Sequence, residues 1–489
     1  MVASKKKVIT GFLWNLGEKL LIQVIAFIVG LILARKLGPE TYGLVATVSI
    51  IISLLTVATN LYTGTYLMRK KDVDSLDMNT AFYFGLFINI LIYISLFFTA
   101  PLLASFYGHS ELIALLRVMG IGVLASSFMG IKLVIIVRNY QYKKLFFASL
   151  IGTLTAGIVG IVFAFIGFGP WALVAQHTLD CIVDTIILWI VVRWVPKFEF
   201  SFGRLKQMLR YGLPLWLYGI ADSLSTRLQQ LIIGKKYTSS DLAFYNRGES
   251  FPVIVESNAT SSLNDVLLRR VSENQDDFST VKETLRKITK LCLYISVPAM
   301  FGLAAVANTT IELLLGKEWL PSVIFMEIFC FSFALKPIEI TSDISLKAVG
   351  FTRRFFTFGL IKKGLFILAV ICSVPFGIKS IAIAFLIASL IACCVSVVAN
   401  KICFKLSVSS QFADILLPLS VSFIMMVFVS KVGLLLTGTP LTISLIFQII
   451  FGVILYTLSL LVVDQKTVSN FKLLVYSFFN KGRSKSEKA

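Results

Sequence analysis

Long apolar stretches, separated by short polar loops, cover the chain from Val8 to Val463. Each stretch holds roughly 20 residues or more, which is the number that an α-helix needs to cross a hydrocarbon layer of about 30 Å. The pattern predicts an all-α polytopic membrane protein with about 14 transmembrane helices. The predicted spans are 8–34, 42–62, 80–103, 112–137, 145–167, 171–194, 211–233, 245–268, 289–314, 323–346, 355–376, 378–404, 414–436 and 441–463.

Basic residues are distributed unevenly between the two sides of the predicted spans. If the amino terminus is cytoplasmic, the inside segments carry about four basic residues for each one in the outside loops, which is the bias that cytoplasmic loops show. An even number of spans returns the carboxyl terminus to the cytoplasm. The net charge of +20 then reflects topology, and we expect no nucleic-acid partner because no soluble face remains to carry a basic surface.

Composition agrees with this interpretation, since 57% of the residues are hydrophobic and only 15% are charged. The first span follows three lysines but is too long for a signal peptide, and Arg35-Lys36 follows it, so we interpret it as an uncleaved anchor. All seven cysteines lie in or at the end of apolar spans without metal-ligand spacing, which is typical of reduced packing residues. The two histidines, His109 and His177, are far apart, so we expect no metal site.

A partial internal repeat relates two segments that lie 200 residues apart. Residues 33–43 and 233–243 each combine the end of a long apolar helix, two basic residues, a polar turn and a new apolar run. Six spans separate them, so both copies have the same orientation in the membrane, as in the parallel repeats of transporters. We predict an N-terminal six-helix lobe at 1–200 and a C-terminal six-helix lobe at 201–405. Residues 406–489 then hold two extra transmembrane helices and a basic cytoplasmic tail.

Charged residues inside several spans require an explanation, because each costs about 2.5–3.5 kcal/mol at the bilayer centre on insertion scales. Lys19 lies roughly 16 Å into the first span, which is too deep for its ammonium to reach the interface easily. Arg227 and Lys336 lie inside the seventh and tenth spans. By contrast, Arg117 and Lys132 lie towards span ends, where we expect the charged head to reach the interface.

The tenth span has the most informative pattern. Ser332, Lys336, Glu339, Asp343 and Lys347 recur at steps of three or four residues, so they share one helix face. Pro337 removes a backbone hydrogen bond beside Lys336 and is expected to bend the helix there.

Four other spans carry polar faces of the same kind. Asn15 and Gln23 lie one turn before and after Lys19, with Glu18 at the edge of that face. In the seventh span, Asp222 and Gln229 share a stripe. The second span carries a polar face that includes Ser53 and Asn60, and the eighth span carries one that includes Glu249 and Glu256. Polar faces drawn from both lobes are what a shared hydrated cavity requires.

A structural interpretation of these residues remains open. Lys336 with Glu339, or Asp222 with Arg227, would also serve as internal ion pairs, and hydroxyl and amide stripes often hold transmembrane helices together. In the sixth span, His177, Asp180 and Asp184 suit either a proton-linked relay or a hydrogen-bonded packing cluster.

A series of short motifs gives the chain a family resemblance. It resembles bacterial polysaccharide flippases of the Wzx type, near the colanic-acid exporters, in the multidrug/oligosaccharidyl-lipid/polysaccharide (MOP) exporter superfamily. The chain departs from that pattern in the sixth span, where His177, Asp180 and Asp184 stand in place of mainly uncharged residues. The motifs are Trp14-Asn-Leu-Gly-Glu18, the stretch from Ile32 to Ala46, Gly167-Phe-Gly-Pro-Trp-Ala-Leu-Val-Ala175, Tyr211-Gly-Leu-Pro-Leu-Trp216, Leu231-Ile-Ile-Gly234, Tyr245-Asn-Arg247 and Leu315-Gly-Lys-Glu-Trp-Leu-Pro321.

The resemblance implies alternating access around a central polar cavity in the bacterial cytoplasmic (inner) membrane. It also implies that undecaprenyl-diphosphate-linked oligosaccharide moves from the cytoplasmic to the periplasmic leaflet for surface polysaccharide or O-antigen (lipopolysaccharide) assembly, beside polysaccharide polymerase machinery. We expect Lys19, Arg227 and Lys336 to neutralise the diphosphate. Candidate sugar contacts are Asn15, Gln23, Ser53, Asn60 and Gln229. Candidate cavity or coupling residues are Glu18, Asp222, Glu339, Asp343, His177, Asp180 and Asp184, which would act with a proton or Na+ and no other cofactor.

Two alternatives come from other classes. A cation-coupled multidrug antiporter of the same superfamily would favour acids and aromatics for cationic drugs, whereas these spans mix cations with acids. A membrane enzyme acting on lipid-linked sugars would need a sizeable outer loop with catalytic side chains, but the predicted outer loops are short. We therefore expect a transporter without catalytic residues.

Overall fold

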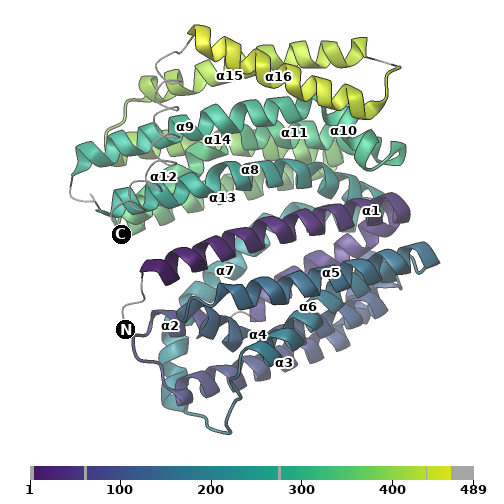
Figure 1. Ribbon diagram of the computed structural model, residues 1–489, viewed down its shortest axis with the longest axis vertical. Helices are drawn as coiled ribbons and strands as arrows, with labels where there is room; N and C mark the ends of the chain where they lie inside the picture. Colours follow the sequence, from purple (N-terminus) through teal and green to yellow (C-terminus); the bar gives the residue numbers. More distant parts are fainter. Residues whose placement is uncertain (1–4, 60–62, 274–276, 437, 464–489) are drawn as a thin grey trace. The chain divides into compact units, whose positions relative to one another are not determined.

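The computed structural model describes residues 5–59, 63–273, 277–436 and 438–463, and every regular element in these ranges is a helix (Figure 1). Ten helices within them are long and apolar enough to cross a membrane. The predicted all-α polytopic class is confirmed, whereas the number of 14 spans stays a prediction. The chain forms two compact units, 1–243 and 244–489, which we call unit 1 and unit 2. The predicted lobe boundaries likewise stay predictions.

Unit 1 begins with a helix that covers the first two predicted spans. This helix, α1, is kinked at Gly38, whose φ of 74° and ψ of 170° are not helical. Glycine adopts a positive φ without a steric penalty, and Pro39 cannot donate a backbone hydrogen bond, so the kink falls where the sequence tolerates it. The helices of unit 1 are α1 (Lys5–Thr59), α2 (Thr63–Arg69), α3 (Ser75–Tyr107), α4 (Leu112–Arg138), α5 (Tyr142–Ile166), α6 (Trp171–Val191) and α7 (Phe202–Lys236).

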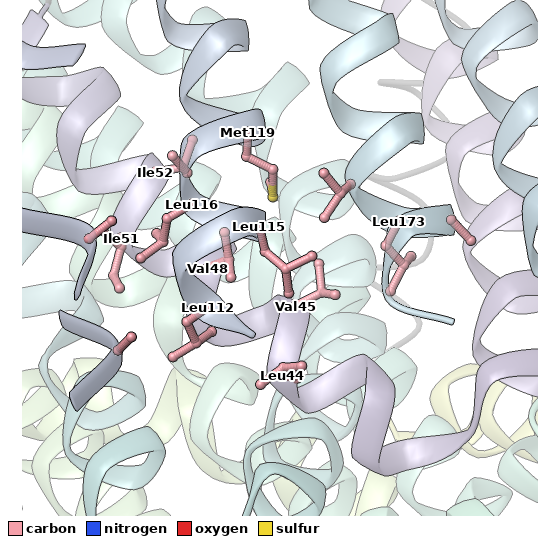
Figure 2. Close-up of a cluster of buried hydrophobic side chains, with 14 of the residues drawn as sticks. Leu44, Val45, Val48, Ile51, Ile52, Leu112, Leu115, Leu116, Met119 and Leu173 are labelled. Carbon is pink, nitrogen blue, oxygen red and sulfur yellow. The ribbon is translucent and has the colours of Figure 1, made fainter. Parts of the chain in front are cut away.

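A cluster of buried aliphatic side chains forms the centre of unit 1 (Figure 2). Val48 of α1 meets Leu115 and Met119 of α4 and Leu173 of α6 in this cluster. Lipid tails are as apolar as leucine, so close packing and dispersion stabilise this contact more than the hydrophobic effect does. Large apolar side chains on the opposite faces are exposed, such as Phe98 and Ile190, as expected of surfaces that meet lipid.

Unit 2 contains the remaining helices, and α8 starts just before the boundary between the units. The last two predicted spans are found as α15 and α16; α15 packs on α9 and α16 packs on α15. The elements are α8 (Ser239–Glu273), α9 (Phe278–Ala305), α10 (Ala307–Leu314), η1 (Lys317–Ser322), α11 (Val323–Ala334), α12 (Lys336–Ala348), α13 (Thr352–Ser373), η2 (Val374–Phe376), α14 (Ile378–Phe404), α15 (Val408–Leu435) and α16 (Leu441–Val463).

The tenth predicted span is a broken helix. α11 ends at Ala334 and α12 begins at Lys336, with Leu335 between them at φ −98° and ψ 0°. Pro337 follows at the second position of α12, where its missing N–H costs nothing because the first turn of a helix has no intrahelical acceptor. The predicted bend beside Lys336 is confirmed, and it places this cation at the start of a helix.

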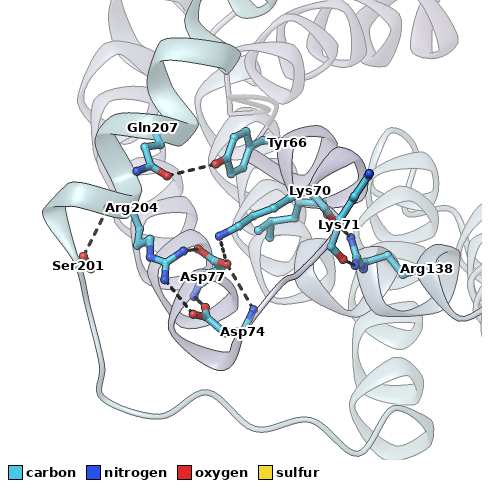
Figure 3. Close-up of polar contacts among 10 residues, drawn as sticks. Tyr66, Lys70, Lys71, Asp74, Asp77, Arg138, Ser201, Arg204 and Gln207 are labelled. Atoms are coloured by element: carbon cyan, nitrogen blue, oxygen red, sulfur yellow. Dashed lines mark hydrogen bonds and ion pairs between the residues drawn. The ribbon is translucent and has the colours of Figure 1, made fainter. Parts of the chain in front are cut away.

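An ion-pair network joins the start of α7 to the start of α3 (Figure 3). The carboxylate of Asp77 is buried and binds both Lys70 and Arg204, with Arg204 Nη1 3.2 Å from Asp77 Oδ1. Arg204 Nη2 also lies 3.0 Å from Asp74 Oδ2. The pKa of Asp74 is lowered, chiefly because the backbone N–H of Asp77 donates to its carboxylate, and also because Arg204 and Lys70 are near. The network therefore fixes the start of α7 against the start of α3.

Lys132 of α4 differs from the sequence-based expectation. Its side chain is only 1% exposed, and its ammonium donates to the carbonyl oxygen of Val192 at 2.8 Å and to that of Trp194. The ammonium also lies 4.2 Å from the centre of the Trp189 ring. The expectation that Lys132 reaches the interface is wrong, because carbonyl groups beyond the end of α6 and an aromatic face solvate the charge inside unit 1.

The two repeat segments meet at a close contact. The start of α8 passes so near to α1 that a Cβ placed on Gly43 would lie 1.7 Å from the backbone oxygen of Ser239. Gly234, at the end of α7, faces the hydroxyl of Thr47 in the same region. Only glycine permits this approach of two backbones.

We expect Gly43→Ala to destabilise the protein by about 1–3 kcal/mol, because backbone rather than a flexible side chain must move to admit the methyl group. The thermal unfolding midpoint of the purified protein in detergent measures the effect. Gly85→Ala on α3 is the matched control, because nothing lies within 4 Å of a Cβ at that helical position. Equal unfolding midpoints for the two variants would contradict the close contact.

Candidate functional site

The three cations predicted to bind a diphosphate lie on three different helices. Lys19 of α1 is exposed, and Arg227 of α7 is half-buried; both belong to unit 1. Arg227 Nη1 donates to Gln230 Oε1 at 3.1 Å. Lys336 of unit 2 is half-buried at the start of α12, with its ammonium 4.7 Å from the centre of the Phe333 ring. Their predicted role as diphosphate ligands stays a prediction.

A group of carboxylates lies inside unit 1 where α1, α5 and α6 pack together. Ser149 donates to Glu18 Oε1 at 3.5 Å, and Thr153 donates to Asp180 Oδ1 at 3.1 Å. The charge of Asp184 interacts with those of Asp180 and Glu18, so the three carboxylates form one electrostatic group. We call Glu18, Asp180 and Asp184 the unit 1 acid group.

Asp184 has an unusual environment within this group. Its Oδ1 is buried and has no hydrogen-bond partner among the described residues. The same atom would lie 1.9 Å from a Cβ on Gly152 of α5, so the absence of a side chain at Gly152 makes room for the carboxylate. A buried carboxylate without a donor or a cation favours the binding of a proton or a small cation.

His177 lies one helical turn before Asp180 on α6, and the two interact electrostatically. His177 is more exposed than Asp184, which is half-buried. The structure thus places His177 at the edge of the unit 1 acid group. Whether these residues form a relay or a packing cluster stays open, and the described residues contain no group of three or more metal-ligating side chains.

The acids of the tenth span have a different partner from the one that the sequence suggested. Lys362 of α13 reaches both: its Nζ lies 2.8 Å from Asp343 Oδ1, 2.9 Å from Asp343 Oδ2 and 3.4 Å from Glu339 Oε1. The side chain of Lys362 is 6% exposed, whereas those carboxylates are 26–30% exposed. Lys336 makes no ion pair among the described residues, so the cation that neutralises Glu339 comes from α13 rather than from the same helix.

The carboxylates inside the two units therefore have different partners. In unit 2 an internal ammonium balances part of the negative charge of Glu339 and Asp343. In unit 1 the acid group accepts hydrogen bonds from the hydroxyls of Ser149 and Thr153, and no salt bridge to it is formed within the described ranges. Sequence reasoning missed Lys362, although its place seven residues inside the span 355–376 was a signal for it.

The predicted sugar contacts are only partly placed. Gln229 is 3% exposed within unit 1, and Gln23 is half-buried on α1. Ser53 donates to the carbonyl oxygen of Ile50 in its own helix at 2.7 Å, which leaves its lone pairs for another donor. Asn60 and the side chain of Asn15 lie outside the described residues. Asp222 is half-buried on α7.

Comparison with known proteins gives a consistent group of relatives. A family model described as "Polysaccharide biosynthesis protein" matches residues 32–324. The chain is 25% identical over 306 residues to the succinoglycan biosynthesis transport protein ExoT of Rhizobium meliloti. This alignment covers 63% of this chain and 62% of ExoT. It is 20% identical over 379 residues to the lipopolysaccharide biosynthesis protein WzxC of Escherichia coli, covering 75% of each. The match to ExoT thus spans less than two thirds of the length of that relative.

Solved structures share the fold at low sequence identity. The inward closed lipid II flippase MurJ aligns with a TM-score of 0.77 at 14% identity, over 94% of this chain and 100% of that chain. An inward-facing multidrug resistance transporter of the MATE family aligns with a TM-score of 0.63 at 14% identity, over 80% of this chain and 96% of that chain. At this identity the likeness shows the fold alone: the chain shares its helical fold with both transporters.

We expect Lys362→Met to destabilise the protein by up to about 3 kcal/mol, because it leaves two partly buried carboxylates without their cation. Adding Asp343→Asn to Lys362→Met should restore part of the loss, since one of the stranded charges is then removed. Arg353→Met, at an exposed position of α13, is the control. Thermal unfolding in detergent measures all four proteins, and a double variant no more stable than Lys362→Met would contradict the pairing.

Proposed function

Because the chain belongs to the polysaccharide biosynthesis protein family, whose model covers residues 32–324, we propose that it is a flippase for lipid-linked oligosaccharides. Its substrate is an oligosaccharide repeat unit on undecaprenyl diphosphate, which moves from the cytoplasmic to the periplasmic leaflet of the bacterial inner membrane. Both chain termini are cytoplasmic in this proposal, as the distribution of basic residues favours. The observation that carries it is the set of cations within spans of a fold shared with a lipid II flippase.

The diphosphate sets the physical requirement for flipping. Its charge cannot enter hydrocarbon unless fixed cations and donors replace the lost water. Arg227 carries five N–H groups, and one of them donates to Gln230, so the fork retains donors for phosphate oxygens. Lys19 and Lys336 act as point charges that meet the diphosphate elsewhere on its path. The prenyl tail stays in the lipid, where it costs nothing to solvate.

The sugars need partners of another kind. Amide and hydroxyl groups such as those of Gln23, Gln229 and Ser53 exchange hydrogen bonds with sugar hydroxyls, and they lie on the same helices as two of the cations. No covalent step is needed, so the activity requires no catalytic residue. The family match supports this substrate class over a cationic drug, because the relatives with printed functions belong to polysaccharide biosynthesis.

We assign the coupling of transport to an ion gradient to the acid group of unit 1. The acid group of Glu18, Asp180 and Asp184 brings three carboxylates together without a salt bridge to any described cation, so a proton or Na+ can bind there and dissociate during the cycle. In unit 2 the ammonium of Lys362 already occupies that role for Asp343 and Glu339. A difference in ion affinity between two conformations is what couples an ion gradient to transport.

We expect Lys19→Ala, Arg227→Ala and Lys336→Ala each to reduce export of the polysaccharide about tenfold to a hundredfold, which is the range for one charge-assisted contact. The amount of protein in the membrane should stay unchanged. Surface polysaccharide and membrane abundance are measured together in cells that carry each variant as their only copy. Lys287→Ala is the control, because this exposed lysine pairs only with Glu283 on its own helix among the described residues. Export at the wild-type rate from all three variants would refute the assignment.

We expect Asp184→Asn to remove the response of transport to an ion gradient, because a neutral amide cannot take up a proton or balance Na+. The measurement is flipping of a lipid-linked oligosaccharide in proteoliposomes, with a pH gradient, a Na+ gradient or neither imposed. Glu327→Gln is the control, since this carboxylate is also half-buried but belongs to unit 2. An unchanged response in Asp184→Asn, or an equal loss in Glu327→Gln, argues against coupling through unit 1.

A further inference from the structure

We propose that the connector between α6 and α7 anchors unit 1 at the surface of the bilayer, where its aromatic side chains insert among anionic phospholipids. The connector comprises residues 192–202, and we call it the aromatic connector. It has no regular secondary structure before α7 begins at Phe202, and Figure 3 shows it as the extended loop that reaches Ser201. None of the residues assigned to transport belongs to it.

The aromatic connector exposes an unusual amount of apolar surface. The exposed fractions of its large apolar residues are 72% for Val195, 98% for Phe198, 42% for Phe200 and 81% for Phe202. The ring of Phe198 stacks beside that of Tyr83 with 5.8 Å between their centres, so the aromatic surface continues onto α3. Exposed apolar surface of this kind marks a contact with a membrane or with another protein.

Hydrogen bonds hold the polar side of the aromatic connector against α3. The backbone N–H of Lys197 donates to Asn79 Oδ1 at 3.2 Å, and that of Ser201 donates to Thr80 Oγ1 at 3.2 Å. Between these two contacts, Asn79 Nδ2 donates to Glu199 Oε2 at 3.0 Å. Neighbouring side chains of an extended chain point to opposite sides. The three phenylalanines alternate with the bound residues, so they are left on the outer side, in agreement with their exposure.

The contacts also fix the depth of the aromatic connector along the spanning helices. Thr80 lies five residues after the start of α3, which is roughly 8 Å along the helix. At the other end of the connector, Lys132 binds the carbonyl oxygens of Val192 and Trp194, and it lies six residues before the end of α4, or roughly 9 Å. The headgroup region is roughly 5–8 Å thick on each side of the hydrocarbon. The connector therefore lies where headgroups meet hydrocarbon, which is also where the predicted apolar span of α3 begins.

The charges around the aromatic connector indicate the kind of lipid. Its only carboxylate, Glu199, is engaged by Asn79. Interfacial segments that combine aromatic residues with cations bind anionic lipids, because the cations attract the negative surface while the rings enter the apolar boundary. Depth and charge together favour a lipid surface over a soluble protein partner. The exposed cations between residues 192 and 210 are Arg193, Lys197, Lys206 and Arg210.

The test places the photo-crosslinking amino acid p-benzoylphenylalanine in place of Phe198 in the full-length chain, in its own cell membrane. After irradiation, a denaturing gel and mass spectrometry of the peptides identify what was captured. The peptide with position 198 should carry phospholipid, with anionic lipids enriched about twofold or more over their share of that membrane. In place of Leu91, an exposed residue eleven positions further into α3 than Thr80, the same amino acid should capture lipid without this enrichment. In place of Asp72, in the exposed loop before α3, it should capture little lipid.

Matched variants test the cations. Lys197→Gln combined with Lys206→Gln should lower the enrichment of anionic lipid at position 198 about twofold. Lys282→Gln combined with Lys287→Gln removes an equal charge from exposed positions near the start of α9 and should leave the enrichment unchanged.

Three results would overturn the proposal. Equal enrichment in the two double variants would refute the selection of anionic lipids by the cations. A crosslinked product that contains another protein or a second copy of the chain would refute the assignment to lipid. Position 198 without an adduct, while position 91 captures lipid, would place the aromatic connector in water. These readouts involve no transport, so they fail or succeed independently of the proposed flippase activity.

Discussion

The cost of placing charge in hydrocarbon governs how this molecule is built, because each ionised group inside a span needs a partner or an assigned ligand. The described residues meet this requirement in two ways, and one group of acids lacks both. Lys132 is solvated by backbone carbonyls and an indole ring, and Asp343 is neutralised by the ammonium of Lys362. The unit 1 acid group has neither arrangement, since Asp184 Oδ1 is buried without a donor among the described residues. Asp184, whose Oδ1 has no donor within the described ranges, is the carboxylate to which we assign the binding of the coupling ion.

The same contrast separates charges that hold helices together in unit 2 from the carboxylates of unit 1 that we assign to ion binding. An ion pair such as Lys362 with Asp343 contributes little net stability, but breaking it costs up to about 3 kcal/mol because a partly buried charge is left without a partner. It therefore fixes α13 against α12, which is the second half of the broken tenth span. A carboxylate that awaits an ion is less stable in the empty state, and this difference is what an ion gradient can use. The same fold thus contains carboxylates that are paired with an internal lysine and carboxylates that we assign to ion binding.

The sequence was sufficient for the class of the fold and for some local features. Apolar periodicity predicted the helices, and Pro337 predicted the break beside Lys336, because a missing N–H and a fixed φ act locally. Partners across helices were harder to foresee. Glu339 was expected to pair with Lys336 on its own face, but Lys362 approaches from another helix, and sequence spacing contains no information about that approach. Lys132 was misjudged for the same reason, since the carbonyl of Val192 that it binds is 60 residues away. The contact between Gly43 and Ser239 likewise depends on how two backbones cross.

Flippase activity is tested most directly by the fate of lipid-linked oligosaccharide after the gene for this chain is deleted from its own cell. We expect complete repeat units to accumulate on undecaprenyl diphosphate in the cytoplasmic leaflet, where an impermeant sugar-modifying reagent applied from the periplasmic side cannot reach them. Restoring the wild-type chain should clear them. Normal surface polysaccharide without a trapped intermediate, in a cell with no second flippase, would contradict the account.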